Sequence, residues 1–182
     1  MTNHRKVIVH IGTSADGYIA RADGDLEWLT SRPAPKGFYG MNAFMQSIDT
    51  KVLGRKTFEV SLRMGAKFDS KDRTIVFSHH PPPADAPSGV EFVNEAIGPY
   101  VSRLREQPGK DIWLMGGGGI IASFLDAQAI DEFVISMAPV FIGDGIPLIA
   151  RRHRHVLLDL QSVEKFEDGL VQMHYHVQKQ QS

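Results

Sequence analysis

Four consecutive glycines, Gly116 to Gly119, separate two strongly apolar segments of this chain. Glycine destabilises the interior of a helix or strand by roughly 0.5–1 kcal/mol relative to alanine, so such a run needs a physical reason. The preceding segment is typical of a strand and the following one of a helix. A helix N-terminus offers unpaired N–H groups and a partial positive charge. The run predicts close backbone approach to a phosphate, although a plain turn could also hold it.

A second segment, Gly54-Arg55-Lys56-Thr57, repeats this arrangement of glycine between a strand and a helix. The strand is predicted at Lys51 to Leu53, and the helix begins near Thr57. Arginine and lysine bind phosphate through charge-assisted hydrogen bonds. The alternative is a cationic surface turn.

A third polar segment, Ser78-His79-His80, follows the apolar strand predicted at Arg73 to Phe77. Sheets of α/β domains bind ligands at the carboxyl ends of their strands. We expect Ser78 and His79 to take part and His80 to face solvent. Together, the three segments predict one long ligand with several phosphates.

Composition narrows the class of protein. The 182 residues carry a formal net charge of -1 and no cysteine. This balance provides no basic field for nucleic acid or an anionic membrane, and disulfides and thiolate metal sites are excluded. No apolar run approaches the ~20 residues of a membrane span. We therefore expect a cytoplasmic protein that binds no nucleic acid and no membrane, with a single domain over 1–182.

Strand and helix patterns alternate along the chain and predict an α/β domain. Its central sheet is mostly parallel, with helices on both faces, and Asp168-Gly169 closes a C-terminal antiparallel hairpin. Thr13 to Gly24 is predicted to be a loop, and Asn94 to cap a helix. Further strands are predicted at Lys6 to Ile11, Val90 to Val93, Asp111 to Met115, Asp131 to Met137, Ser162 to Phe166 and Leu170 to Val177.

The set of motifs resembles the dihydrofolate-reductase-like superfamily, and more closely its branch with the reductase domain of riboflavin biosynthesis. The resemblance extends from Val7 to Val177. The motifs that carry it are Ser14 to Ala20 (SADGYIA), Gly54 to Glu59 (GRKTFE), Ile75 to His80 (IVFSHH), Leu114 to Leu125 (LMGGGGIIASFL), Asp131 to Gly145 (DEFVISMAPVFIGDG) and the closing hairpin.

This resemblance implies a three-layer, dihydrofolate-reductase-like fold that binds NADPH in extended form. Gly116–Gly117 matches a pair joined by a cis peptide bond in dihydrofolate reductases. The loop Asp16 to Gly24 would close over the nicotinamide. The family often has arginine where His79 stands, which leaves the choice between NADPH and NADH open. The implied contacts are Gly54, Arg55, Lys56 and Thr57 for the phosphates, Ser78 and His79 beside the 2′-phosphate, Gly116, Gly117, Gly118, Gly119 and Ile120 under the pyrophosphate, and Gly12, Thr13 and Ile19 around the nicotinamide.

The proton donor is the least defined part of the resemblance. Dihydrofolate reductases use a carboxylate on the first helix, and Asp25 and Glu27 are the candidate catalytic residues here. Their distance from Gly54 is about twice that expected from the family, so a charge pair at a helix start is the alternative. The folate-binding branch often has tyrosine where this chain has Ile121, and both departures argue against folate.

We therefore expect an NADPH-dependent reductase of a small heterocycle, most like 5-amino-6-(5-phosphoribosylamino)uracil reductase. A dihydrofolate or pteridine reductase and a non-catalytic NADP-binding sensor are the alternatives. By analogy with the branch we expect a homodimer, packed through the strand face with Val171, Met173, Tyr175 and Val177.

Two histidine-containing segments remain. His174 and His176 share one face of a strand, but the sequence shows no third ligand nearby, so we predict no metal site. Arg151 to His155 is a basic cluster that could meet a phosphorylated substrate, although a solvated surface is our expectation.

Overall fold

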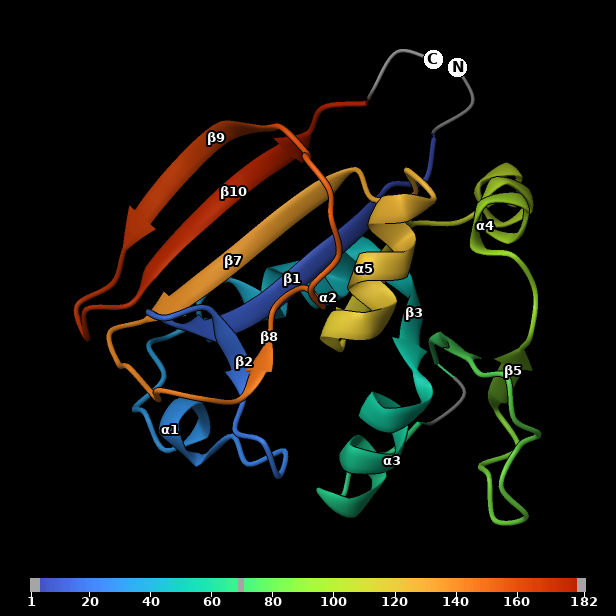
Figure 1. Ribbon diagram of the computed structural model, residues 1–182, viewed down its shortest axis with the longest axis horizontal. Coiled ribbons are helices and arrows are strands. Elements are labelled where there is room, and N and C mark those ends of the chain that lie inside the picture. Colours follow the sequence, from blue (N-terminus) through green and yellow to red (C-terminus); the bar gives the residue numbers. More distant parts are fainter. Residues whose placement is uncertain (1–3, 69–70, 180–182) are drawn as a thin grey trace.

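The computed structural model describes residues 4–68 and 71–179. Its largest element is one eight-stranded sheet, whose strands are rich in branched apolar residues (Figure 1). The strand order is β5-β4-β3-β6-β1-β7-β10-β9. The first six strands pair in parallel, whereas β10 pairs antiparallel with both β7 and β9. The strands of this sheet are β1 (Val7–Ser14), β3 (Ile48–Gly54), β4 (Arg73–Phe77), β5 (Val90–Val93), β6 (Asp111–Gly116), β7 (Glu132–Ala138), β9 (Leu158–Lys165) and β10 (Val171–Val177). A separate two-stranded sheet consists of β2 (Tyr18–Ala20) and β8 (Ile146–Pro147).

Helices cover both faces of this sheet, and Figure 1 shows α5 in front of it and α2 behind. Successive strand residues point to opposite faces, so Val52 and Leu53 enter two different clusters. Val52 packs in the cluster that contains residues of α4 and α5, and Leu53 packs with Phe58 of α3. The helices are α1 (Glu27–Thr30), α2 (Met41–Ser47), α3 (Arg55–Arg63), α4 (Ile97–Glu106) and α5 (Gly118–Asp126).

The predicted three-layer α/β fold, with a mostly parallel sheet and a C-terminal antiparallel hairpin, is confirmed. Two local predictions are wrong. The segment predicted as a loop contains β2, which pairs with β8 from a distant part of the chain. Asn94 does not cap α4, whose N-cap is Ala96; its side-chain oxygen lies 2.9 Å from Nδ1 of His79 instead.

The face of β10 that was expected to meet a second subunit is partly used inside the chain. Tyr175 and Val177 pack against the larger core cluster, together with Leu148, Ile149 and Val156 from the segment that crosses this face. Exposed apolar side chains lie on the edge strand β9 instead, where Leu160 and Val163 are 55% and 57% exposed.

Among the described residues, no helix has both the length and the apolar character that crossing a membrane requires.

Candidate active site

A cleft of about 860 Å³ opens at the carboxyl ends of β3 and β6 and extends over β1. This volume lies within the range of roughly 300–1,000 Å³ that is typical of small-molecule sites. Its wall is mainly apolar and includes Leu29, Trp113, Met115 and Ile120. Such a wall excludes water from a bound ring, so polar contacts with the few hydrophilic side chains become stronger.

Two helix N-termini meet in this cleft. Gly54 is the N-cap of α3 and Gly117 is the N-cap of α5. The backbone N–H of Gly117 donates to Oγ1 of Thr57 over 2.8 Å, which fastens one helix start to the other. The first N–H groups of a helix have no partner within it, and both starts line the cleft. The cleft therefore offers unpaired donors and two partial positive charges to an anion.

Different physical reasons explain why glycine stands at the positions of the run Gly116 to Gly119. A Cβ on Gly118 would lie 2.3 Å from the carbonyl oxygen of Pro147, so packing against the 147–150 backbone requires glycine there. A Cβ on Gly119 would meet nothing within 4 Å, and this residue lines the cleft. Gly116 has a φ of +113°, and the expected cis peptide bond between Gly116 and Gly117 is confirmed. Of the four, Gly119 is therefore the position that leaves room for a ligand.

Arg55 connects the glycine-capped start of α3 to the end of the neighbouring strand. Its Nη1 donates to the carbonyl oxygen of Pro81 over 2.6 Å, and its Nε donates to Glu59 over 2.6 Å. Ser78 and His79 lie just beyond Phe77, which is paired with Gly54 in the sheet. Neither of them is among the described residues that line the cleft, so they could meet only a ligand that extends past it.

The residues predicted to surround the nicotinamide do not all face the cleft. Gly12 and Ile19 line the cleft, whereas Thr13 is buried and points to the opposite face of the sheet. A Cβ on Gly12 would lie 2.6 Å from Cδ2 of Leu29. Glycine at this position therefore allows α1 to lie close against β1.

The loop that was expected to close over this end is fastened to the rest of the protein. The carboxylate of Asp16 accepts hydrogen bonds from the hydroxyl of Ser14 and from the N–H groups of Ile142 and Gly143. The hydrogen bond from Ser14 is the largest cause of a lowered pKa of Asp16, and the two backbone donors add to it. With the β2–β8 pairing, these bonds fix one flank of the cleft.

His10 is a cleft residue that the sequence interpretation missed. It stands in an apolar strand, and a lone histidine there was the only available signal. Burial, followed by the charge of His174, lowers the pKa of His10 to about 4, so its ring is neutral at pH 7. Its Nδ1 is buried without a hydrogen-bond partner among the described residues. His10 thus lines the cleft with its Nδ1 enclosed, and its ring packs edge-on against Phe44, which packs in turn against Trp113.

Arg32 and Tyr39 were also missed, and they line the same end of the cleft. Nη2 of Arg32 and the hydroxyl of Tyr39 donate to one oxygen of Asp168, over 2.8 and 2.7 Å. The hydrogen bond from Tyr39, supported by Arg32, holds the pKa of Asp168 below its usual value. The hairpin turn predicted at Asp168-Gly169 therefore orients two side chains of the cleft.

The candidate proton donors lie outside the cleft. Oδ1 of Asp25 accepts from the N–H of Glu27 at the start of α1, and Oδ2 lies 3.4 Å from Arg21. Gly24 and Leu26 line the cleft, but Asp25 and Glu27 are not among its described lining residues. The described lining contains no carboxylate at all. A catalytic role for either residue stays a prediction.

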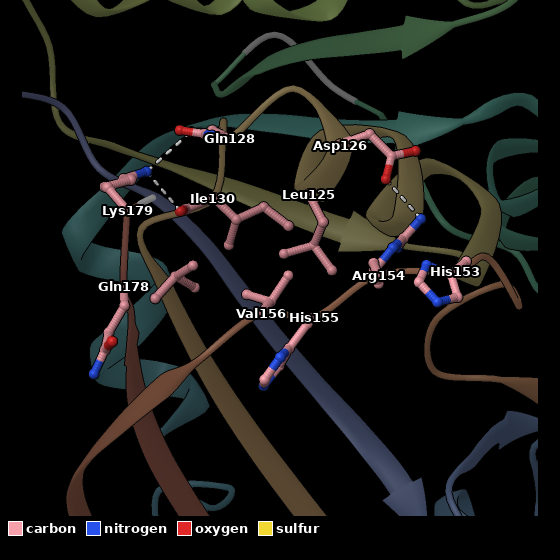
Figure 2. Close-up of a pocket in the computed structure, with 11 residues that line it drawn as sticks. Leu125, Asp126, Gln128, Ile130, His153, Arg154, His155, Val156, Gln178 and Lys179 are labelled. Carbon is pink, nitrogen blue, oxygen red and sulfur yellow. Dashed lines mark hydrogen bonds and ion pairs between the residues drawn. The ribbon is translucent and has the colours of Figure 1, made fainter. Parts of the chain in front are cut away.

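The basic cluster 151–155 borders a separate cavity of about 330 Å³ at the end of α5 (Figure 2). Arg152 and Arg154 both form ion pairs with Asp126. In the same cavity, Nζ of Lys179 donates to the carbonyl oxygens of Gln128 and Ile130. Arg152 and Arg154 are thus engaged with Asp126, and no residue of 151–155 is among the described residues that line the glycine-lined cleft.

Comparison with known proteins adds family information to this geometry. The family model described as the RibD C-terminal domain matches residues 5–172. The uncharacterized protein YwjB of Bacillus subtilis is 34% identical over 171 residues, covering 94% of this chain and 97% of YwjB.

Solved structures agree with this match. A crystal structure from Shewanella sp. PV-4 is 30% identical, with a TM-score of 0.84 and coverage of 96% of this chain and 99% of that one. The deaminase and 5-amino-6-(5-phosphoribosylamino)uracil reductase of Thermotoga maritima has a TM-score of 0.74 at 17% identity. This match covers 96% of this chain and 57% of that one. A dihydrofolate reductase of Enterococcus faecalis, solved with NADP(H), has a TM-score of 0.63 at 21% identity. This match covers 96% of this chain and 97% of that one. The last two likenesses establish the dihydrofolate-reductase-like fold.

The glycine run yields a prediction with opposite effects at adjacent positions. Gly119→Ala should raise the free energy of unfolding by about 0.5–1 kcal/mol, because alanine favours the helix and has room for its methyl group. The same methyl group should weaken binding of a dinucleotide, because it enters the cleft. Gly118→Ala should lower the free energy of unfolding, because its methyl group would overlap the oxygen of Pro147. Urea unfolding and NADPH titration of both variants test this; a stabilised Gly118→Ala would contradict it.

Proposed function

The chain belongs to the RibD C-terminal domain family, and on that premise we propose that it is an NADPH-dependent reductase of a small heterocyclic substrate. The substrate would be most like that of 5-amino-6-(5-phosphoribosylamino)uracil reductase. The observation that carries this proposal is the convergence of the α3 and α5 N-termini in one cleft. Two adjacent anion sites suit the phosphates of one dinucleotide.

The phosphate contacts would come from both helix starts. Lys56 lines the cleft beside Gly54 and Thr57, and its ammonium would meet a phosphate as a point charge. The open space at Gly119 would let the pyrophosphate approach the backbone. Ser78 and His79 would meet the adenosine end, where Arg55 already contacts the neighbouring carbonyl of Pro81.

The nicotinamide would lie over β1, against Gly12 and Ile19. NADPH supplies the hydride when it is bound, and the protein must hold the acceptor carbon against the donor carbon. The end of the cleft with His10, Tyr39 and Trp113 has the apolar surface and the few polar groups that a heterocycle requires.

The two alternative functions make different demands on this cleft. A dihydrofolate or pteridine reductase with the family's usual proton donor would need a carboxylate near the nicotinamide. The described cleft residues provide none, which favours the pyrimidine substrate. A sensor module would bind the cofactor and leave every substrate unchanged.

Turnover tests the proposal directly. Consumption of NADPH should require 5-amino-6-(5-phosphoribosylamino)uracil or a close pyrimidine analogue, and dihydrofolate should give little or none. Lys56→Gln should lower kcat/KM by about 10–100-fold, since a hydrogen bond to a charged group contributes roughly 1.5–3 kcal/mol. Lys67→Gln, at an exposed lysine outside the cleft, is the matched control and should be unchanged.

Each other outcome has a definite meaning. Cofactor binding with no turnover of either substrate would support the sensor, and efficient turnover of dihydrofolate would support the folate alternative. Equal effects of Lys56→Gln and Lys67→Gln would remove the phosphate role proposed for Lys56.

Asp25 and Glu27 provide a separate test of the proton donor. Loss of a general acid typically costs 10²–10⁴-fold in rate. Because both side chains lie outside the cleft, we expect Asp25→Asn and Glu27→Gln to change kcat by less than about tenfold. A fall of a hundredfold or more in either variant, with NADPH affinity retained, would restore that residue as the acid.

We also propose that the chain forms a homodimer through the exposed apolar side chains of β9. Leu160 and Val163 would be buried in such a contact, which would also cover an otherwise unpaired sheet edge. The expected mass in solution is that of two subunits. Val163→Lys should shift it toward one, and Ser162→Lys on the same strand is the control. A single-subunit mass for the unmodified chain at high concentration would exclude the dimer.

A further inference from the structure

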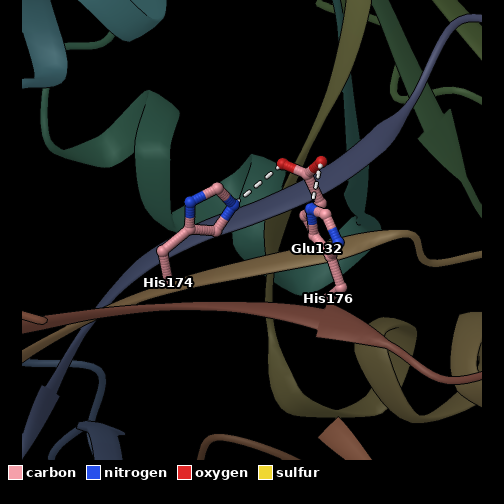
Figure 3. Close-up of side chains that lie close together, drawn as sticks. All are labelled: Glu132, His174 and His176. Atoms are coloured by element: carbon pink, nitrogen blue, oxygen red, sulfur yellow. Dashed lines mark hydrogen bonds and ion pairs between the residues drawn. The ribbon is translucent and has the colours of Figure 1, made fainter. Parts of the chain in front are cut away.

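Three side chains with metal-binding atoms converge on the sheet face opposite α5 (Figure 3). Glu132 begins β7, and its partner across the β7–β10 ladder is His176. His174 lies two residues earlier on β10 and shares the same face, one diagonal step from Glu132. The sequence shows only the His-x-His pair; the antiparallel pairing supplies the third ligand from 42 residues away.

The donor atoms already point at one another. Nε2 of His174 lies 2.9 Å from Oε2 of Glu132, and Nε2 of His176 lies 3.2 Å from Oε1. Figure 3 shows one nitrogen of each ring turned toward the carboxylate. One donor atom from each residue lies within 4.8 Å of the other two. Tetrahedral zinc with bonds of about 2.0–2.2 Å separates its ligand atoms by roughly 3.3–3.6 Å, so small side-chain adjustments suffice.

Burial and charge also suit a cation. The side chain of Glu132 is 8% exposed, whereas those of His174 and His176 are 33% and 48% exposed. The site is thus anchored on a buried carboxylate and open to solvent through its imidazoles. Burial raises the pKa of Glu132, but hydrogen bonds from Lys6 and His174 outweigh it and leave that pKa below its usual value. The carboxylate is ionised at neutral pH, as metal ligation requires.

We propose that Glu132, His174 and His176 bind a divalent transition-metal ion, with zinc the best match, and that the ion ties β10 to β7. Two imidazoles and a carboxylate are a ligand set of zinc sites with an open fourth position, and imidazole favours zinc, nickel or copper over magnesium and calcium. The site is separate from the cofactor cleft, so it stands whether or not the reductase assignment holds.

Lys6 is the internal competitor for this site. Its Nζ lies 2.7 Å from Oε1 of Glu132, and its side chain is 49% exposed. An incoming metal ion would displace this ammonium, which can move into solvent on its flexible stem. Removing the charge of Lys6 should therefore strengthen metal binding, whereas removing a ligand should weaken it. A cluster that only forms ion pairs and binds no metal predicts no such opposite effects of the two kinds of substitution on metal affinity.

Zinc titration of tag-free, chelator-treated protein tests the proposal by calorimetry and by melting temperature. We expect one Zn²⁺ per chain and a rise in melting temperature. His176→Asn is the primary variant, because its half-exposed side chain can change without unfolding the protein. It should weaken binding at least about tenfold, since even changes to residues that only hydrogen-bond a metal ligand typically cost 10–100-fold in metal affinity. Lys6→Met should tighten binding severalfold.

His153→Asn is the matched control, because 153–155 is a second His-x-His sequence that lies outside any strand. It should leave zinc affinity unchanged. Glu132→Gln should also weaken binding, and Co²⁺ should show the intense visible absorption of tetrahedral coordination in the unmodified chain but not in His176→Asn. The proposal is overturned if zinc does not bind, if His176→Asn binds as tightly as the unmodified chain, or if Lys6→Met weakens binding.

Discussion

The hydrogen bond from Gly117 to Thr57 is the contact on which the cleft depends. It holds the starts of α3 and α5 together, and parallel pairing of β3 with β6 brings those starts to the same edge of the sheet. The glycines allow this closeness, because a Cβ at Gly117 would lie 3.0 Å from Oγ1 of Thr57 and one at Gly54 would lie 3.4 Å from Cβ of Ile120. The presence of two helix starts in one cleft therefore follows from the topology of two neighbouring strands and the residue types at their ends.

Much of this could be read from the sequence. Apolar strand segments, alternating with helical patterns, predicted the mostly parallel sheet, and Asp168-Gly169 predicted the hairpin. Gly54 to Thr57 and the glycine run stood directly after strands, where local pattern is sufficient to place a helix start. The sequence did not show that a side chain at Gly118 would overlap Pro147, or that one at Gly119 would have free space. The difference depends on the packing of a segment about 30 residues away.

The missed features all depend on contacts between distant segments. The short strand β2 exists through its pairing with β8, which no local pattern in Thr13 to Gly24 indicates. His10 becomes a cleft residue because its strand is central and α2 lies over it, with Phe44 against its ring. Glu132 joins His174 and His176 only through the register of β7 with β10. A pattern read along one segment cannot provide such a register.

We propose that the two helix starts bind one dinucleotide. The shift in melting temperature of the unmodified chain with NADPH, with NADH and without ligand tests it most directly. A ligand at a hundredfold excess over its Kd stabilises the folded state by about 2.7 kcal/mol. We expect a clear rise with NADPH, and a smaller rise with NADH if His79 contacts the 2′-phosphate. No rise with either cofactor would mean that the cleft is not a dinucleotide site.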